Sequence, residues 1–311
     1  MRAVVEVDRL TKKFGSFTAV DSISFSIEPG TIFGFLGANG AGKSTTIRML
    51  CGLLRPSSGR ARVAGFDVYK EAFRIKQVIG YMSQKFSLYL DLTVAENLEF
   101  FGRVYGLNDL RLQTSLARLK KITGLEGREG LLTSELPVGW RQRLALSCAL
   151  LHDPEIIFLD EPTGGVDPLA RRQFWDLIYE QAERGKTIFV TTHYLDEAEY
   201  CHQLRIIHAG RIIAAGSPRE IKQKYFPENL LELACAQPLE AYEWLQRQPE
   251  IKQVSLFGLK LHLLVEPEAV SGLRRKLSQS GLGHFDLRPI VPSIEDVFIR
   301  RLEEEAGERG K

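Results

Sequence analysis

The sequence contains few cysteines, and they lie far apart: Cys51, Cys148, Cys201 and Cys235. No CxxC pair occurs, so neither a zinc site nor a dithiol redox motif is indicated. Most of these cysteines have apolar neighbours, which favours buried and reduced thiols. Reduced thiols are typical of a cytosolic protein, and we expect that location.

A hydrophobic run of membrane-spanning length is also missing. A transmembrane helix needs about 20 consecutive apolar residues, and no segment approaches that length. Residues 1–10 alternate valine with charge and lack the apolar core of a signal peptide. If this protein works at a membrane, we therefore expect another polypeptide to cross the bilayer.

A strong charge of one sign is missing too. The 41 lysines and arginines are balanced by 39 aspartates and glutamates, which leaves a formal net charge of +2. This balance gives no electrostatic reason to expect nucleic acid as the main partner. What remains is an ordinary globular composition, 44% hydrophobic over 311 residues, long enough for about two domains.

Strands alternate with helices over the first part of the chain, as in a doubly wound α/β sheet. We expect strands at 4–7, 17–27, 31–36, 78–82, 156–159 and 187–191, a hairpin at 204–213, and helices at 43–54, 141–151 and 171–183. Residues 92–136 have mostly helical patterning. These elements predict one domain at 1–225, with a helical subdomain at about 86–150.

The pattern changes near residues 225–229. Beyond them we expect strands at 230–234, 254–256, 260–265 and 286–289, and helices at 239–247, 267–278 and 294–302. This order predicts a small α+β domain at 226–302. The last residues, 303–311, are highly charged and are expected to form a frayed tail.

A glycine-rich loop lies between the strand at 31–36 and the helix at 43–54. It matches G-x-x-x-x-G-K-[ST] in full, a loop whose backbone N–H groups cradle phosphates. Lys43 can reach the β- and γ-phosphates, and the Ser44 hydroxyl can bind Mg²⁺. The predicted nucleotide-binding residues of this segment are Gly37, Asn39, Gly40, Ala41, Gly42, Lys43, Ser44 and Thr45.

Two acidic residues and a histidine follow buried strands. Asp160 directly follows the strand at 156–159, the position at which P-loop enzymes place an acid that holds Mg²⁺. Glu161 comes next and could deprotonate the attacking water. His193 follows the strand at 187–191, at the edge where such sheets build ligand sites. A lone histidine is more often structural, so spacing alone leaves its role open.

In combination these motifs resemble ATP-binding cassette (ABC) ATPases over about residues 4–222. The matching segments are 37–44 (Walker A), Gln84 (Q-loop), 159–163 (Walker B), 165–168 with Asp167 (D-loop) and 191–193 (switch histidine). The resemblance implies a P-loop NTPase fold with a RecA-like core, an N-terminal antiparallel β subdomain and a helical subdomain.

The resemblance also implies roles for individual residues. Glu161, His193 and Gln84 would be catalytic, and Mg²⁺ would be bound by Ser44, Gln84 and Asp160. Phe14 falls where an aromatic ring stacks on the adenine of ATP, and Phe17 is a second candidate.

The signature segment departs from the family pattern. The usual Leu-Ser-Gly-Gly is replaced by Leu136-Pro137-Val138-Gly139. Family members dimerise head to tail, and this serine bonds the γ-phosphate held by the partner. Pro137 has neither a hydroxyl nor a backbone N–H. The second ABC domain could therefore be a different one with an intact signature, or another copy of this chain that works through its remaining amides.

The resemblance finally predicts membrane partners. In ABC proteins, the segment after Gln84 forms a groove for a helix of the membrane subunit, and residues 88–101 resemble it. The C-terminal segment 292–298 resembles that of ABC-2 exporters, which implies permease subunits of that type and a location on the inner face of the cell membrane. Two alternatives stay open: a soluble ABC ATPase acting on ribosomes or DNA, and a regulatory module that does not hydrolyse ATP.

Overall fold

The computed structural model describes residues 3–85, 87–226, 230–280, 282 and 284–309. The chain divides into two compact units, Met1–Ser217 and Pro218–Lys311. The division precedes helix α7 (Pro218–Tyr225), whereas we expected it after residue 225. Helix α7 belongs to the second unit because it packs against helix α10 (Ile294–Arg309), where Arg300 donates a hydrogen bond to the carbonyl of Tyr225.

A six-stranded sheet forms the centre of the first unit, in the order β10-β9-β3-β8-β7-β6. Strands β3 (Ile32–Leu36), β6 (Ile79–Met82), β7 (Ile156–Asp160), β8 (Thr187–Thr192) and β9 (Gln203–His208) are parallel, and β10 (Arg211–Gly216) returns antiparallel to β9. Every residue of β3, β7 and β8 is buried, because both faces of the sheet are covered. The predicted α/β class is confirmed.

A second, antiparallel sheet of the first unit has the order β2-β1-β4-β5. Its strands are β1 (Val5–Phe14), β2 (Phe17–Ile27), β4 (Ser58–Val63) and β5 (Phe66–Asp67). Alternate residues of β2 face the core, since Ile23, Phe25 and Ile27 are buried. Sequence analysis did not predict β4, in which only Ala61 and Val63 are buried among small and charged residues.

Five phenylalanines pack between these two sheets. Neighbouring ring centroids lie 5.2–6.2 Å apart. They come from β2, β3, β7 and β8, and are Phe25, Phe33, Phe35, Phe158 and Phe189. The strands that lead to the predicted site residues therefore share one packed core.

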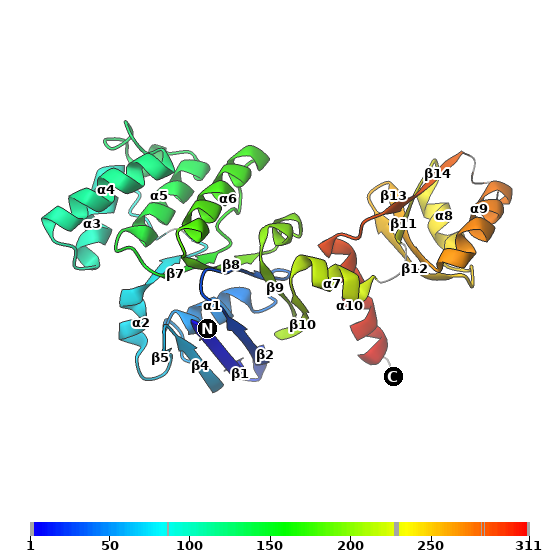
Figure 1. Cartoon of the computed structure of the whole chain (residues 1–311), viewed down its shortest axis with the longest axis horizontal. Helices are drawn as coiled ribbons and strands as arrows, with labels where there is room; N and C mark the ends of the chain where they lie inside the picture. Colours follow the sequence, from blue (N-terminus) through cyan, green and yellow to red (C-terminus); the bar gives the residue numbers. More distant parts are fainter. Residues whose placement is uncertain (1–2, 86, 227–229, 281, 283, 310–311) are drawn as a thin grey trace. The chain divides into compact units, whose positions relative to one another are not determined.

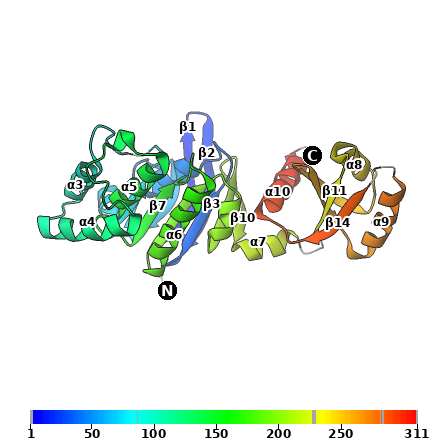
Figure 2. The ribbon, with the colours of Figure 1, turned by 90° about the horizontal axis from the view of Figure 1, so that it is seen from above.

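Helices surround the sheets of the first unit. Helix α1 (Lys43–Leu50) follows β3, and α2 (Ala72–Val78) precedes β6. Helices α3 (Val94–Val104), α4 (Asp109–Thr123) and α5 (Val138–Leu150) gather at one end of the unit (Figures 1 and 2). Helix α6 (Pro168–Glu183) packs against β8, and a short 3₁₀ helix, η2 (Asp196–Tyr200), precedes β9.

The second unit follows a β-α-β-β-α-β order that is typical of ferredoxin-like domains. Its elements are β11 (Leu230–Cys235), α8 (Pro238–Leu245), β12 (Ile251–Phe257), β13 (Lys260–Val265), α9 (Val270–Gln279) and β14 (Phe285–Ile290). The antiparallel sheet has the order β12-β13-β11-β14. Helices α8 and α9 lie on one side of it and α10 on the other (Figure 2).

Helix α10 reaches Arg309, where we expected a charged tail from residue 303. Charged pairs one turn apart support this extension: Arg300 and Glu304 lie 3.1 Å apart, nitrogen to oxygen. No helix within the described ranges is long and apolar enough to cross a membrane. Cys51, Cys148 and Cys201 are buried free thiols, and burial raises the pKa of each.

Candidate functional site

The loop at 37–44 is packed so tightly that glycine is required at two positions. A Cβ atom on Gly37 would lie 2.3 Å from the carbonyl oxygen of Ile207, and one on Gly42 would lie 2.5 Å from that of Ala19. Gly42 also has φ +110°, which L side chains rarely adopt. The loop therefore curls against its neighbours and leads directly into the N-terminus of α1, an arrangement that fits phosphate.

Lys43, the first residue of α1, points its ammonium back into the loop. Its Nζ donates to the carbonyl oxygens of Gly37 at 2.8 Å and Ala38 at 3.1 Å. The same Nζ lies 3.0 Å from Oε1 of Glu161, and both side chains are buried. The loop lysine and the predicted catalytic glutamate therefore form a buried ion pair.

Ser44 and Asp160 form the second contact between the loop and the end of β7. The Ser44 hydroxyl donates to Oδ1 of Asp160 at 3.1 Å, and the Thr191 hydroxyl donates to the same oxygen at 2.7 Å. Burial raises the pKa of Asp160, while the two hydrogen bonds act in the opposite direction. A carboxylate and a hydroxyl at this distance are oxygen ligands of the kind that Mg²⁺ prefers, so the residues present fit that ion.

Glu161 is the residue on which the site converges. Its Oε2 accepts a hydrogen bond from Nε2 of Gln84 at 3.1 Å and lies 3.0 Å from Nδ1 of His193. Its backbone has φ +49°, in the left-handed region, and its N–H bonds the hydroxyl and carbonyl of Thr191 at 2.9 and 3.1 Å. The three residues that sequence analysis assigned to catalysis therefore meet in one place.

Sequence analysis missed Thr191, which binds both acids of the site. The available signal was a polar residue directly after the apolar run at 188–190, near the carboxyl end of the strand. It also missed Glu197, a buried carboxylate of η2 that accepts hydrogen bonds from Thr163 and Thr192. Nothing in the local sequence marks Glu197, because its neighbours Asp196 and Glu199 are exposed acids.

The signature and D-loop residues lie at helix starts. Pro137 is the exposed N-cap of α5, and its carbonyl accepts from the N–H of Trp140 at 3.0 Å. Leu136 is buried, and Val138 and Gly139 begin the helix half-buried. Asp167 caps α6 by accepting from the N–H of Ala170 at 3.0 Å.

Within the described residues, no hydrogen bond or ion pair joins the Glu161 cluster directly to 136–139, Asp167 or Phe14. Phe14 and Phe17 instead form a cross-strand pair at the exposed turn between β1 and β2, with 49% and 62% of their surfaces exposed. Either ring offers a flat exposed surface, so the choice between them stays open. Asn39 and Gly40 are exposed at the rim of the loop, and Thr45 is half-buried.

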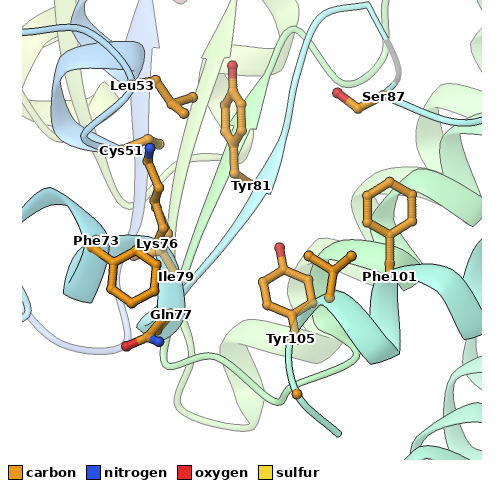
Figure 3. Close-up of a pocket in the computed structure, with 12 residues that line it drawn as sticks. Cys51, Leu53, Phe73, Lys76, Gln77, Ile79, Tyr81, Ser87, Phe101 and Tyr105 are labelled. Carbon is orange, nitrogen blue, oxygen red and sulfur yellow. The ribbon is translucent and has the colours of Figure 1, made fainter.

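A cavity of about 620 Å³ lies between α2, β6 and α3. Phe73 and Lys76 stand on one wall, Phe101 and Tyr105 on the facing wall, and Tyr81 lies between them (Figure 3). Exposed apolar side chains are found next to the cavity residue Phe101 as well: Phe100 packs against it, and Tyr89 packs against Phe100. Of the residues that line the cavity, Phe101 lies within 88–101, the segment for which the sequence predicted a groove.

Known proteins resemble the chain at two levels of coverage. The family model for ABC transporters matches residues 20–164. The probable multidrug ABC transporter ATP-binding protein YbhF of Escherichia coli is 51% identical over 70% of this chain, but the match spans only 38% of that protein's length. The Nod factor export ATP-binding protein I of Paraburkholderia xenovorans is 36% identical over 299 residues, which are 96% of each chain.

A solved structure agrees with these matches. The structure of cbiO1 from Clostridium perfringens, described as part of the ABC transporter complex cbiONQ, superposes with a TM-score of 0.66 and 28% identity. The superposition covers 71% of this chain and 91% of that one. Since a relative that is 36% identical is matched over 96% of its length, and the family model for ABC transporters also matches, the chain belongs to the ABC transporter family and is an ABC ATPase.

Proposed function

We propose that this chain is the ATP-hydrolysing subunit of an ABC exporter of the ABC-2 type. One observation carries the proposal: Lys43, Gln84 and His193 all contact the carboxylate of Glu161 at 3.0–3.1 Å. A buried carboxylate held by three polar groups beside a phosphate loop is suited to general-base catalysis.

ATP would be bound by the amides of residues 37–45 and by Lys43, with the adenine ring on Phe14 or Phe17. The oxygens of Ser44 and Asp160 would hold Mg²⁺, with Gln84 as a further ligand. When bound, Mg²⁺ supplies positive charge that offsets the charge on the phosphates. Both predicted cofactors therefore have residues of suitable chemistry around this loop.

The Lys43–Glu161 ion pair suggests how hydrolysis depends on nucleotide. While Lys43 binds Oε1, that carboxylate oxygen is held in an ion pair. A phosphate that accepts hydrogen bonds from Lys43 competes for that ammonium and leaves Oε1 available for the proton of the attacking water. Gln84 and His193 bind Oε2 and keep the carboxylate oriented during this exchange.

A second ABC domain would complete the site through its signature segment. In this chain that segment retains the amides of Val138 and Gly139 at the start of α5, whereas Pro137 contributes no donor. A homodimer would therefore close more weakly than a pair that includes one intact signature. Differential binding of ATP to the closed pair would drive the conformational change that moves the membrane subunits.

Export is supported by the relatives, which include an ATP-binding protein for Nod factor export and a probable multidrug one. The cavity between α2 and α3 would receive a helix of an ABC-2 type permease and keep this chain on the cytoplasmic face of the cell membrane. Its apolar walls suit the apolar face of an amphipathic helix. The membrane subunit would then select the cargo.

The test is Mg²⁺-dependent ATP turnover by the purified chain over a range of protein concentrations. Turnover that rises more than linearly indicates two identical copies, whereas tight ATP binding with negligible turnover indicates a different partner. Glu161→Gln is expected to abolish turnover and preserve binding, and Glu183→Gln, an exposed residue at the end of α6, serves as control. Unchanged turnover of Glu161→Gln refutes the proposed base.

A further inference from the structure

Glu197 is a fully buried carboxylate outside the cluster described above. Its side chain, in η2, is 0% exposed. Oε1 accepts a hydrogen bond from the Thr163 hydroxyl at 2.5 Å, and Oε2 accepts one from the Thr192 hydroxyl at 2.6 Å. Both threonines are buried as well. One carboxylate therefore joins two loops that are far apart in the sequence.

The two loops are those that carry the proposed base and the switch histidine. Thr163 lies two residues after Glu161, and Thr192 lies immediately before His193. The hydroxyl of Thr192 also accepts a hydrogen bond from the N–H of Tyr194 at 3.0 Å, so both sides of His193 are fixed. The 3.0 Å contact between Glu161 and His193 thus depends on segments that Glu197 connects.

A further contact ties this connection to helix α6. Nε of Arg171 lies 3.6 Å from Oε1 of Glu197, and the guanidinium stacks 3.8 Å from the centre of the Tyr194 ring. Arg171 is one turn beyond Asp167, the residue that caps α6, and its N–H bonds the Asp167 carbonyl at 3.0 Å. The buried charge of Glu197 is therefore partly balanced by a cation on α6.

A buried carboxylate is a costly way to hold a core together. Burying a charge is unfavourable unless it is paired and hydrogen-bonded, and an apolar core of the same volume is often as stable. A carboxylate does offer what an apolar group cannot: two acceptors at fixed separation that set the positions of two hydroxyls. The arrangement around Glu197 uses both acceptors for residues next to the site.

We propose that Glu197 is a positioning residue for ATP hydrolysis. Through Thr163 and Thr192 it fixes the position of Glu161 relative to His193. Arg171 connects this arrangement to α6. The inference rests on the proposed function in one respect, namely that Glu161 acts as the base.

The first experiment separates positioning from stability with single variants. Glu197→Ala is expected to lower kcat by about 10- to 100-fold, as for a misplacement near 1 Å, while KM for ATP changes little because the phosphate loop does not contact Glu197. Glu197→Gln keeps the shape, and its amide can accept from one threonine hydroxyl and donate to the other, so it should recover most of that loss. Thr163→Val removes one hydroxyl and leaves the side-chain volume nearly unchanged. Its kcat should lie between those of Glu197→Ala and Glu197→Gln. Glu199→Ala, an exposed acid of the same short helix, is the matched control.

Assays are run below the unfolding midpoint of every variant, and Thr163→Val carries the test if Glu197→Ala does not fold. A wild-type kcat in Glu197→Ala overturns the inference. So does a loss in Glu197→Gln as large as that in Glu197→Ala, because then charge rather than position matters.

A second readout does not depend on turnover. The ring resonance of His193, assigned among the six histidines by its loss in His193→Gln, is expected to shift in nucleotide-free Thr163→Val and Glu197→Ala. It should stay in place in Glu199→Ala. A stationary resonance in all variants overturns the inference. A wild-type chain that shows no turnover with any partner contradicts the proposed function instead, and the His193 resonance still decides the role of Glu197.

Discussion

Replacing Pro137 by serine would test whether the altered signature limits closure of the ATP-bound pair. Pro137 is the N-cap of α5, with φ −54° and ψ 155°, a conformation that serine adopts readily at that position. The change restores both a hydroxyl and a backbone N–H. Pro137→Ala is the matched control, because it restores the N–H alone.

The serine is expected to change the free energy of unfolding little and the free energy of dimer closure more. A serine cap stabilises a helix by about 1 kcal/mol, but removing proline makes the unfolded chain more flexible and costs about 0.4–1 kcal/mol. The free energy of unfolding should therefore change little. A hydrogen bond to a charged phosphate contributes about 1.5–3 kcal/mol, equivalent to roughly 10- to 150-fold in the closing equilibrium of each site.

The assay is ATP-dependent dimerisation of chains that also carry Glu161→Gln, followed by size-exclusion chromatography with light scattering. The serine variant should dimerise at a protein concentration at least about tenfold lower than the parent, and the alanine variant should lie close to the parent. If serine and alanine variants dimerise alike, the missing hydroxyl does not limit closure. The reasoning from Pro137 would then be wrong.

Three further predictions concern other parts of the first unit. Lys43→Ala should abolish ATP binding and lower the free energy of unfolding by about 3 kcal/mol, because Glu161 loses its buried cation. Adding Glu161→Gln should restore much of the stability. A denaturant melt without that recovery contradicts the ion-pair interpretation. Burial lowers the pKa of His152 from 6.5 to about 4, so the unfolded chain binds more protons between these values and stability falls as pH drops through that window, by up to about 3 kcal/mol. His152→Gln should flatten this part of the pH–stability profile, and an identical slope would exclude His152 as its cause. Phe73 lines the cavity and is 74% exposed, so Phe73→Asp should prevent copurification with the membrane subunit without shifting the unfolding midpoint. Leu110→Asp on α4, at a residue that is 78% exposed, should leave copurification intact. Copurification retained by Phe73→Asp would place the docking surface elsewhere.

The sequence predicted those parts of the site that depend on local chemistry. The loop at 37–44 needs Gly37 and Gly42 for close approach and Lys43 for charge, so its motif is readable in one segment. The buried strands β7 and β8 contain apolar runs, at 156–159 and 188–190, and their carboxyl ends marked Asp160 and His193. The meeting of these residues follows from parallel strands ending at one edge.

Features that arise from tertiary contacts were not readable. Strand β4 buries only two residues and is a strand because it pairs with β1. The role of Glu197 depends on hydroxyls 34 and 5 residues away, and no local pattern distinguishes it from the exposed acids beside it. The unit boundary before Pro218 depends on contacts between α7 and α10, which lie at opposite ends of the second unit's sequence.

The five-phenylalanine core has a mechanical consequence. Phe25, Phe33, Phe35, Phe158 and Phe189 lock β3, β7 and β8 into a slab of low compressibility beneath the nucleotide loop. A densely packed core of this kind deforms little when the loops at its edge move. On the proposed function, a displacement that accompanies ATP hydrolysis would then be carried by the loops at the strand ends to the helices. The stiffness of this phenylalanine core, as well as the chemistry at the nucleotide loop, would then determine how efficiently the domain transmits movement.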